Sequence, residues 1–121
     1  MDIRFKDAQH EERFDELRGR MRDDVYRLPV AYLFALNDEC YRHVNELYDF
    51  DANAIAPEGL EADWQTGTSL KFTKLAFNLY NGWEQCNVSD VFACSDGAYM
   101  LEAVKIRFPE WCGDKNFLKN T

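Results

Sequence analysis

The sequence lacks a long apolar run, a secretion signal and any internal repeat. No stretch of about 18 apolar residues occurs, which excludes a transmembrane helix. The opening residues, MDIRFK, are polar, so we expect a cytoplasmic protein. In such a protein, the four cysteines are expected as reduced thiols or metal ligands rather than as disulfides.

Motifs of common enzymes are also missing. There is no HExxH, no GxSxG and no glycine-rich dinucleotide fingerprint. The stretch GTSLK is not a phosphate-binding P-loop, because Gly67 is its only glycine, no strand precedes it, and Lys71 falls inside a predicted helix. Cys40 and His43 would share one buried helix face, which is a poor place for a nucleophile and its base. The sequence therefore predicts a protein that is not an enzyme.

The chain has no basic patch, and its arginines are interspersed with acids, so we expect no direct binding to nucleic acid. The formal charge is −8, and residues 1–63 carry sixteen acids against eight bases, whereas residues 64–121 carry six of each. The segment 38–63 contains eight acids, with Arg42 as its only base. Such a segment favours a basic partner surface, although acidic surfaces also serve simply to keep a small protein soluble. The predicted partner-binding residues are Glu46, Asp49, Asp51, Glu58, Glu61 and Asp63.

What the sequence does contain is helical periodicity. Apolar residues make up 46% and aromatic residues 15% of 121 residues, enough for one domain with a single core. Apolar residues recur at intervals of three and four positions in four segments, and no segment alternates clearly as a strand would. We therefore predict an all-α fold, a small single-domain helical bundle. Its expected helices lie near 7–22, 29–48, 68–81 and 95–108, with an acidic linker at 49–63.

The third predicted helix is apolar on two sides, which indicates a central position. Its polar strip contains Lys71, Lys74, Asn78 and Asn81. We expect the acidic linker to fold over this strip. The alternative is a small anionic ligand, because the N–H groups at a helix start attract anions. The residues of that alternative site are Thr68, Ser69, Lys71 and Lys74.

Two cysteines and two histidines suggest a structural zinc site. If the bundle runs up-down-up-down, the start of the first helix, the end of the second and the end of the fourth share one end of the molecule. Those places hold His10, Cys40, His43 and Cys112, a complete tetrahedral Zn²⁺ set with no open position for a substrate. The alternatives are that Cys40 packs as a small apolar residue with the histidines at the core margin, or that Cys86 or Cys94 joins another metal set.

Three stretches, DDVYRLPVAYLFALN, WQTGTSLKFTKLAFNLYNGW and FACSDGAYMLEAVKIRFPEWC, resemble an uncharacterised family. Its members are small proteins of unknown function from plasmids, phages and conjugative elements of Gram-positive bacteria. The resemblance covers roughly residues 7–112 and brings no catalytic residues. Small acidic proteins of mobile elements are similar in size and charge to anti-CRISPR proteins, which bind a nuclease surface that otherwise holds DNA or RNA.

The resemblance and the charge together suggest a non-enzymatic acidic protein of a mobile element that acts in the bacterial host cytoplasm. It would inhibit a host nucleic-acid-handling defence complex, such as a Cas effector, by occupying a basic surface of that partner. Two alternatives stay open. One is a regulatory or accessory protein that binds a small anion at the helix start 66–74, and the other is a small metal-dependent enzyme.

Overall fold

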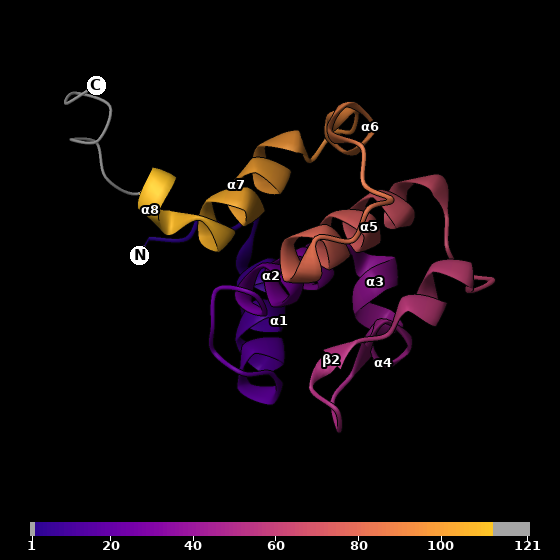
Figure 1. Cartoon of the computed structure of the whole chain (residues 1–121). Coiled ribbons are helices and arrows are strands. Elements are labelled where there is room, and N and C mark those ends of the chain that lie inside the picture. The colour runs from indigo at the N-terminus through magenta and orange to yellow at the C-terminus, as the bar shows by residue number, and fades with distance from the viewer. Residues whose placement is uncertain (1, 113–121) are drawn as a thin grey trace.

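The most apolar segment of the chain forms a helix that is buried on every side. In the computed structural model, which describes residues 2–112, this segment is α2 (Leu28–Leu36), labelled in Figure 1. All residues from Pro29 to Ala35 are buried. A helix that is apolar around its whole circumference has no face suited to water, so other elements have to cover it. The long helices that pack against it are α1 (Ala8–Arg20), α5 (Gly67–Asn81) and α7 (Gly97–Arg107).

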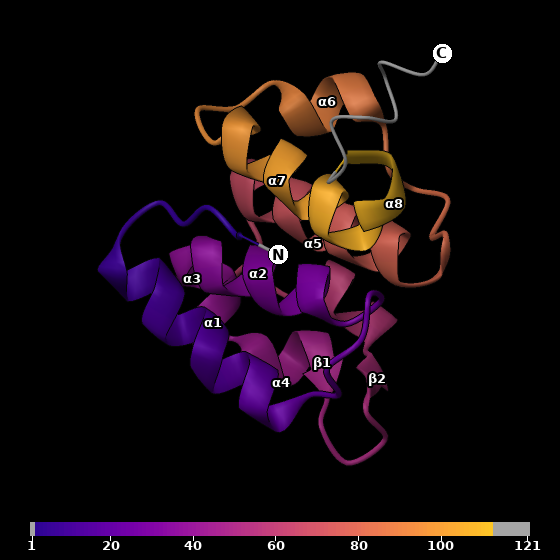
Figure 2. The same cartoon turned by 90° about the vertical axis from the view of Figure 1, so that its left-hand side faces the viewer.

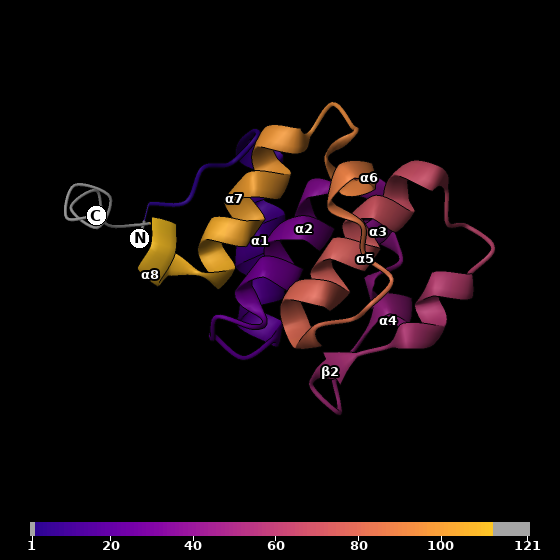
Figure 3. The ribbon, with the colours of Figure 1, turned by 45° about the horizontal axis from the view of Figure 1, so that its top comes forward.

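The described residues form eight α-helices, four of them long, within one small domain. The predicted class, a single helical domain, is thus confirmed. Seen from the side, α2 lies between α1 and the group that contains α6 (Val88–Phe92) and α7 (Figure 2). The short helix α8 (Pro109–Cys112) and the segment around α4 (Val44–Leu47) lie at opposite ends of the molecule (Figure 3).

Helix α1 begins where the sequence supplies a cap. The side chain of Asp7 accepts a hydrogen bond from the backbone N–H of His10 at 2.8 Å, which satisfies one of the free donors at a helix start. The buried face of the helix then carries His10, Phe14 and Leu17 at helical spacing. The observed helix falls within the predicted range 7–22.

The prediction of one helix over 29–48 is wrong. Asn37 has extended backbone, with ψ of 123°, and its side chain accepts a hydrogen bond from the N–H of Cys40 at 3.0 Å. Asparagine side chains compete with the helical ladder in this way, and a cap of this kind contributes about 1 kcal/mol. The chain therefore ends α2 and starts again as α3 (Asp38–Arg42), followed after His43 by α4.

The predicted linker 49–63 has regular structure of its own. Strand β1 (Tyr48–Asp49) pairs antiparallel with β2 (Ala54–Ile55), and a 3₁₀-helix, η1 (Pro57–Glu61), follows. The turn of this hairpin contains Asn53 with φ of 55°, a left-handed conformation that asparagine tolerates better than most residues. Arg27 holds the turn from the core side, because its guanidinium donates to the carbonyl of Asn53 at 2.7 Å. The expectation of an irregular linker without strands is therefore wrong.

Helix α5 carries both of its end signals in its own sequence. Thr66 and Ser69 form a reciprocal capping box, with hydrogen bonds of 3.0 Å and 2.8 Å between side chain and backbone. At the other end Gly82 adopts φ of 80°, the left-handed stop that glycine permits without steric cost. The predicted boundaries, 68–81, differ from the observed ones by one residue.

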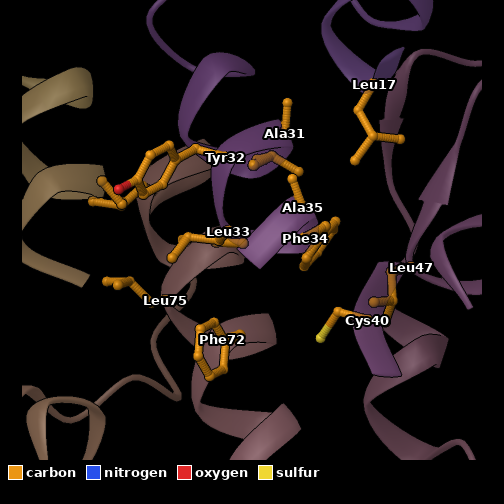
Figure 4. Close-up of a cluster of buried hydrophobic side chains, with 14 of the residues drawn as sticks. Leu17, Ala31, Tyr32, Leu33, Phe34, Ala35, Cys40, Leu47, Phe72 and Leu75 are labelled. Atoms are coloured by element: carbon orange, nitrogen blue, oxygen red, sulfur yellow. The ribbon is translucent and has the colours of Figure 1, made fainter. Parts of the chain in front are cut away.

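One core joins the helices on both sides of α2. Side chains from six helices, α1 to α5 and α7, converge there and are completely inaccessible to solvent, and several of them are drawn in Figure 4. Burying a large apolar side chain of this kind stabilises a fold by about 1.5–3 kcal/mol. One such side chain from each of these helices is Leu17, Leu33, Cys40, Leu47, Phe72 and Met100.

Across the described residues 2–112, every helix is too short or too polar to cross a lipid bilayer.

Gly59 offers a test of how η1 packs on α4. A Cβ atom built at this position would overlap the carbonyl oxygen of Glu46 and lie 2.7 Å from a methyl group of Leu47. We expect Gly59→Ala to lower the free energy of unfolding by about 1–3 kcal/mol, because η1 would have to move away from α4. Denaturant unfolding followed by circular dichroism measures the change.

The matched control is Gly67→Ala in the first turn of α5, where nothing lies within 4 Å of the added carbon. This substitution should leave stability unchanged or raise it slightly. Equal unfolding free energies for the two variants would contradict the packing described for Gly59.

Candidate functional site

Three of the six predicted partner-binding acids line one cleft. Glu46 comes from α4, while Glu58 and Glu61 come from η1, and the cleft between them has a volume of about 320 Å³. Gly59 allows this arrangement, because the absence of a side chain lets η1 approach the backbone of α4 closely. Asn45 contributes an uncharged polar side chain to the lining. We call this feature the acidic cleft.

The charge of this region is not compensated by basic side chains. None of the six acids forms an ion pair with lysine or arginine within the described part of the chain. By contrast, several acids in the first 39 residues have an arginine partner. These pairs are Glu16 with Arg20, Asp23 with Arg18, Asp24 with Arg27, Asp38 with Arg13 and Arg42, and Glu39 with Arg42.

Glu46 is held in place by two aromatic neighbours. The His43 ring stacks on the Trp64 ring with 4.4 Å between centroids and 8° between planes. His43 Nδ1 lies 3.0 Å from one carboxylate oxygen of Glu46, and Trp64 Nε1 donates to the other at 3.2 Å. The wall of the cleft that Glu46 forms is therefore fixed. Sequence reasoning did not assign these roles to His43 and Trp64, because only the fold brings them to Glu46.

The other three predicted acids lie outside the cleft lining and are exposed. Asp49, in β1, caps the hairpin turn by accepting hydrogen bonds at 3.0 Å from the N–H groups of Asp51 and Ala52. Asp51 occupies that turn, and Asp63 follows the end of η1. These residues add negative charge around the hairpin and η1 without sharing a pocket with Glu46.

The predicted anion site at the start of α5 is not assembled. The cap is Thr66, and the Ser69 hydroxyl is buried and already donates to the Gln65 side-chain oxygen at 2.6 Å. Thr68 is exposed and takes no part in the cap. The free N–H groups that would attract an anion are thus partly satisfied by the chain itself.

Part of the polar strip of α5 is covered, but not by the acidic linker. Lys71 Nζ donates to the backbone carbonyls of Asp90 at 2.8 Å and Ala93 at 3.1 Å, at the carboxyl-terminal end of α6. A cation at that position satisfies free carbonyls and interacts favourably with the negative end of the helix dipole. Asn78 donates to the carbonyl of Trp83 at 2.9 Å, and Lys74 lines a separate cleft of about 590 Å³ beside Cys86. The expectation that the linker covers this strip is therefore wrong.

The proposed zinc ligands have other partners. His10 is buried, and its Nδ1 accepts from the Lys6 N–H at 3.1 Å while its Nε2 donates to the Tyr32 carbonyl at 3.0 Å. Both ring nitrogens are therefore occupied. The Cys40 thiol donates to the Ser69 carbonyl at 3.6 Å, and burial raises its pKa to about 12, whereas Zn²⁺ binds the thiolate.

The position of α8 also does not fit a shared ion. This helix ends at Cys112 and lies at the other end of the molecule from α4, which follows His43 (Figure 1). The side chain of Cys112 itself is outside the described residues. Within residues 2–112, no group of three His, Cys, Asp or Glu side chains is arranged to hold a metal ion. The break at Asn37 is the physical reason, because it removes the regular up-down path on which the zinc hypothesis depends.

Fold and surface thus define a small helical domain with an acidic cleft. A family model described as a family of unknown function, DUF6075, matches residues 1–120. The chain belongs to this family. No curated protein and no solved structure matches it.

His10 gives the domain a pH dependence whose sign follows from its burial. Burial lowers the pKa of His10 below its ordinary 6.5, so the folded protein holds the ring neutral while the unfolded chain takes up a proton near pH 6.5. Stability from this residue is complete above pH 6.5 and is lost as the pH falls from there toward the folded pKa. We expect the free energy of unfolding to decrease between roughly pH 7.5 and pH 5, by about 1.4 kcal/mol for each unit of pKa difference.

Denaturant unfolding is measured at several pH values for the His43→Gln protein, in which His10 is the only histidine left, and for the double variant His10→Gln, His43→Gln. His10→Gln keeps an amide donor for the Tyr32 carbonyl but cannot titrate, and its stability should change less with pH. Parallel curves for the two proteins would show that His10 does not cause the dependence.

Proposed function

We propose that this protein is a non-enzymatic binding protein whose acidic cleft docks on a basic surface of a partner protein. The observation that supports the proposal is the meeting of Glu46, Glu58 and Glu61 around one hollow without any lysine or arginine partner in residues 2–112. Carboxylates that lack a lysine or arginine partner in the described part of the chain are suited to accept such side chains from outside, and Glu46 is in addition held in position by His43 and Trp64.

The geometry divides the six acids into two roles. The three glutamates of the cleft would surround a basic side chain of the partner, and Glu46 is already oriented by His43 and Trp64. Asp49, Asp51 and Asp63 lie on the exposed hairpin and loop, where charge acts mainly on the rate of encounter and is screened by salt.

The class of partner follows from the negative charge and from the resemblance to proteins of plasmids and phages. A basic groove that holds DNA or RNA is a surface that an acidic protein would occupy in place of the nucleic acid. We therefore propose a host nucleic-acid-handling defence complex in the bacterial cytoplasm, such as a Cas effector, as the target. The acidic surface would repel the phosphate groups of DNA or RNA, so the proposal includes no direct binding of this protein to nucleic acid.

The two other functions expected from the sequence have less support. The start of α5 at 66–74 is closed by its own capping box, and Lys71 is engaged with α6. A metal-dependent enzyme would need a set of ligands, and residues 2–112 contain no such group.

Charge reversal of the cleft tests the proposal. Purified Cas effectors with their guide RNA serve as the binding panel, and the protein is titrated against each by biolayer interferometry. For an effector that binds, we expect the triple variant Glu46→Lys, Glu58→Lys, Glu61→Lys to bind at least about 100-fold more weakly. The affinity of the unmodified protein should fall steeply between about 50 and 300 mM salt.

The matched control is Glu11→Lys, Glu12→Lys, Asp15→Lys on α1, which changes net charge equally at exposed acids outside the cleft. This variant should bind within a few-fold of the unmodified protein, and target DNA should compete with both. Equal loss in the two triple variants, or binding that salt does not weaken, would contradict docking through the acidic cleft.

A further inference from the structure

A second cleft, far from the acidic residues in sequence, has the opposite chemistry. It lies where the carboxyl-terminal ends of α5 and α7 meet the loop between α1 and α2, the region at the right of Figure 2. Its volume is about 430 Å³, within the range of pockets for small molecules. Among the residues that the structure describes, no aspartate or glutamate lines it. The side chains that give the cleft its chemistry are those of Tyr26, Asn78, Tyr80, Asn81, Arg107 and Phe108.

Arg107 is the only charged residue among the described residues of this lining, and its guanidinium is held in a fixed plane. Its Nε donates to the carbonyl of Leu79 at 2.9 Å. The rings of Tyr26 and Phe108 lie 4.3 Å and 4.5 Å from the guanidinium carbon. These contacts orient the group before any ligand arrives, which lowers the entropy cost of binding.

The two terminal nitrogens of Arg107 remain available. In residues 2–112 no hydrogen bond or ion pair engages them, although Nε is occupied. A guanidinium with both terminal nitrogens available binds the two oxygens of a carboxylate or phosphate as a matching pair. The positive charge of Arg107 is therefore not neutralised by the cleft that contains it.

The rest of the lining supplies further polar and aromatic groups. The Nδ2 atom of Asn78 donates to the Trp83 carbonyl, so the amide oxygen of Asn78 is left as an acceptor. The Tyr80 hydroxyl accepts from Arg27 at 3.3 Å and keeps its own hydrogen for donation. Asn81 is exposed at the edge of the cleft and carries both a donor and an acceptor. Three aromatic rings offer surfaces on which a planar group stacks.

We propose that this cleft binds a small molecule that combines an aromatic ring with a carboxylate or phosphate. The anionic group would pair with the terminal nitrogens of Arg107, and the ring would stack among Tyr26, Tyr80 and Phe108 while the two asparagine amides bond to its polar edge. This site is separate from the start of α5 that the sequence suggested, and it does not depend on the acidic cleft.

The test uses two probes that carry the two anionic groups, adenosine 5′-monophosphate and 4-hydroxybenzoate. Each is titrated into ¹⁵N-labelled protein and followed by the amide signals of Asn78 and Asn81 and the Nε–H signal of Arg107. We expect saturable shifts at these positions with at least one probe. Inorganic phosphate and phenol, which each lack one half of the ligand, should bind about tenfold or more weakly than the better probe. The probe that binds tells whether the source of the negative charge is a phosphate or a carboxylate.

Variants then distinguish binding in this cleft from general electrostatic attraction to the protein surface. Asn81→Asp places a negative charge at the exposed edge and should weaken binding about tenfold or more, without disturbing the core. Gln9→Glu, which makes the same change of charge on the exposed surface of α1, should leave it unchanged. Arg107→Lys keeps the charge but loses the planar pair of donors and should also weaken binding.

The absence of saturable shifts with both probes at about 10 mM would overturn the proposal. So would shifts that map away from the cleft, or equal affinities of the Asn81→Asp and Gln9→Glu proteins.

Discussion

Covering α2 on all sides is the constraint on which the rest of the structure depends. A helix with no polar face cannot lie on the surface, so α1, α5 and α7 have to surround it, and the polar segments that connect them are forced outward. Both clefts arise in this outer layer. The acidic cleft forms where α4 and η1 return along the outside, and the Arg107 cleft forms where the ends of α5 and α7 leave the core. The segments that line the two clefts are therefore held in place by an apolar core, while their charged side chains lie outside that core.

Arg27 connects that core to the acidic side of the molecule. Its guanidinium contacts Asp24, the hydroxyls of Tyr48 and Tyr80, and the carbonyl of Asn53, so one half-buried side chain joins the start of α2, the hairpin and α5. Burial opposes its charge, but the hydrogen bonds to Tyr48 and Asp24 outweigh this cost and raise the pKa of Arg27. A hairpin with only two residues in each strand is too short to be stable alone. Its position, and with it the positions of Asp49 and Asp51, depends on this anchor.

Local patterns in the sequence predict the helix ends that are set by bonds between neighbouring residues. Asp7 before α1, and Gly82 after α5, mark helix ends through bonds to neighbouring residues, and the observed boundaries agree closely with the predicted ones. The sequence alone does not predict the break at Asn37, because the apolar periodicity continues on both sides of it as Leu33, Cys40 and Val44. The two clefts, by contrast, depend on contacts between residues that are far apart in the sequence, which no local pattern predicts. Trp64 reaches Glu46, and Arg107 reaches Tyr26, across long stretches of chain, and only the folded core sets those distances.

The unequal pairing of charges has a consequence for how the molecule approaches others. Arginines neutralise several acids of the first 39 residues locally, and residues 64–121 carry equal numbers of acids and bases, so the net negative charge is concentrated in the segment 46–63. A molecule with this uneven distribution of charge has an electric dipole moment. In the field of a positively charged surface it would rotate before contact, so that most successful encounters begin with the same face forward.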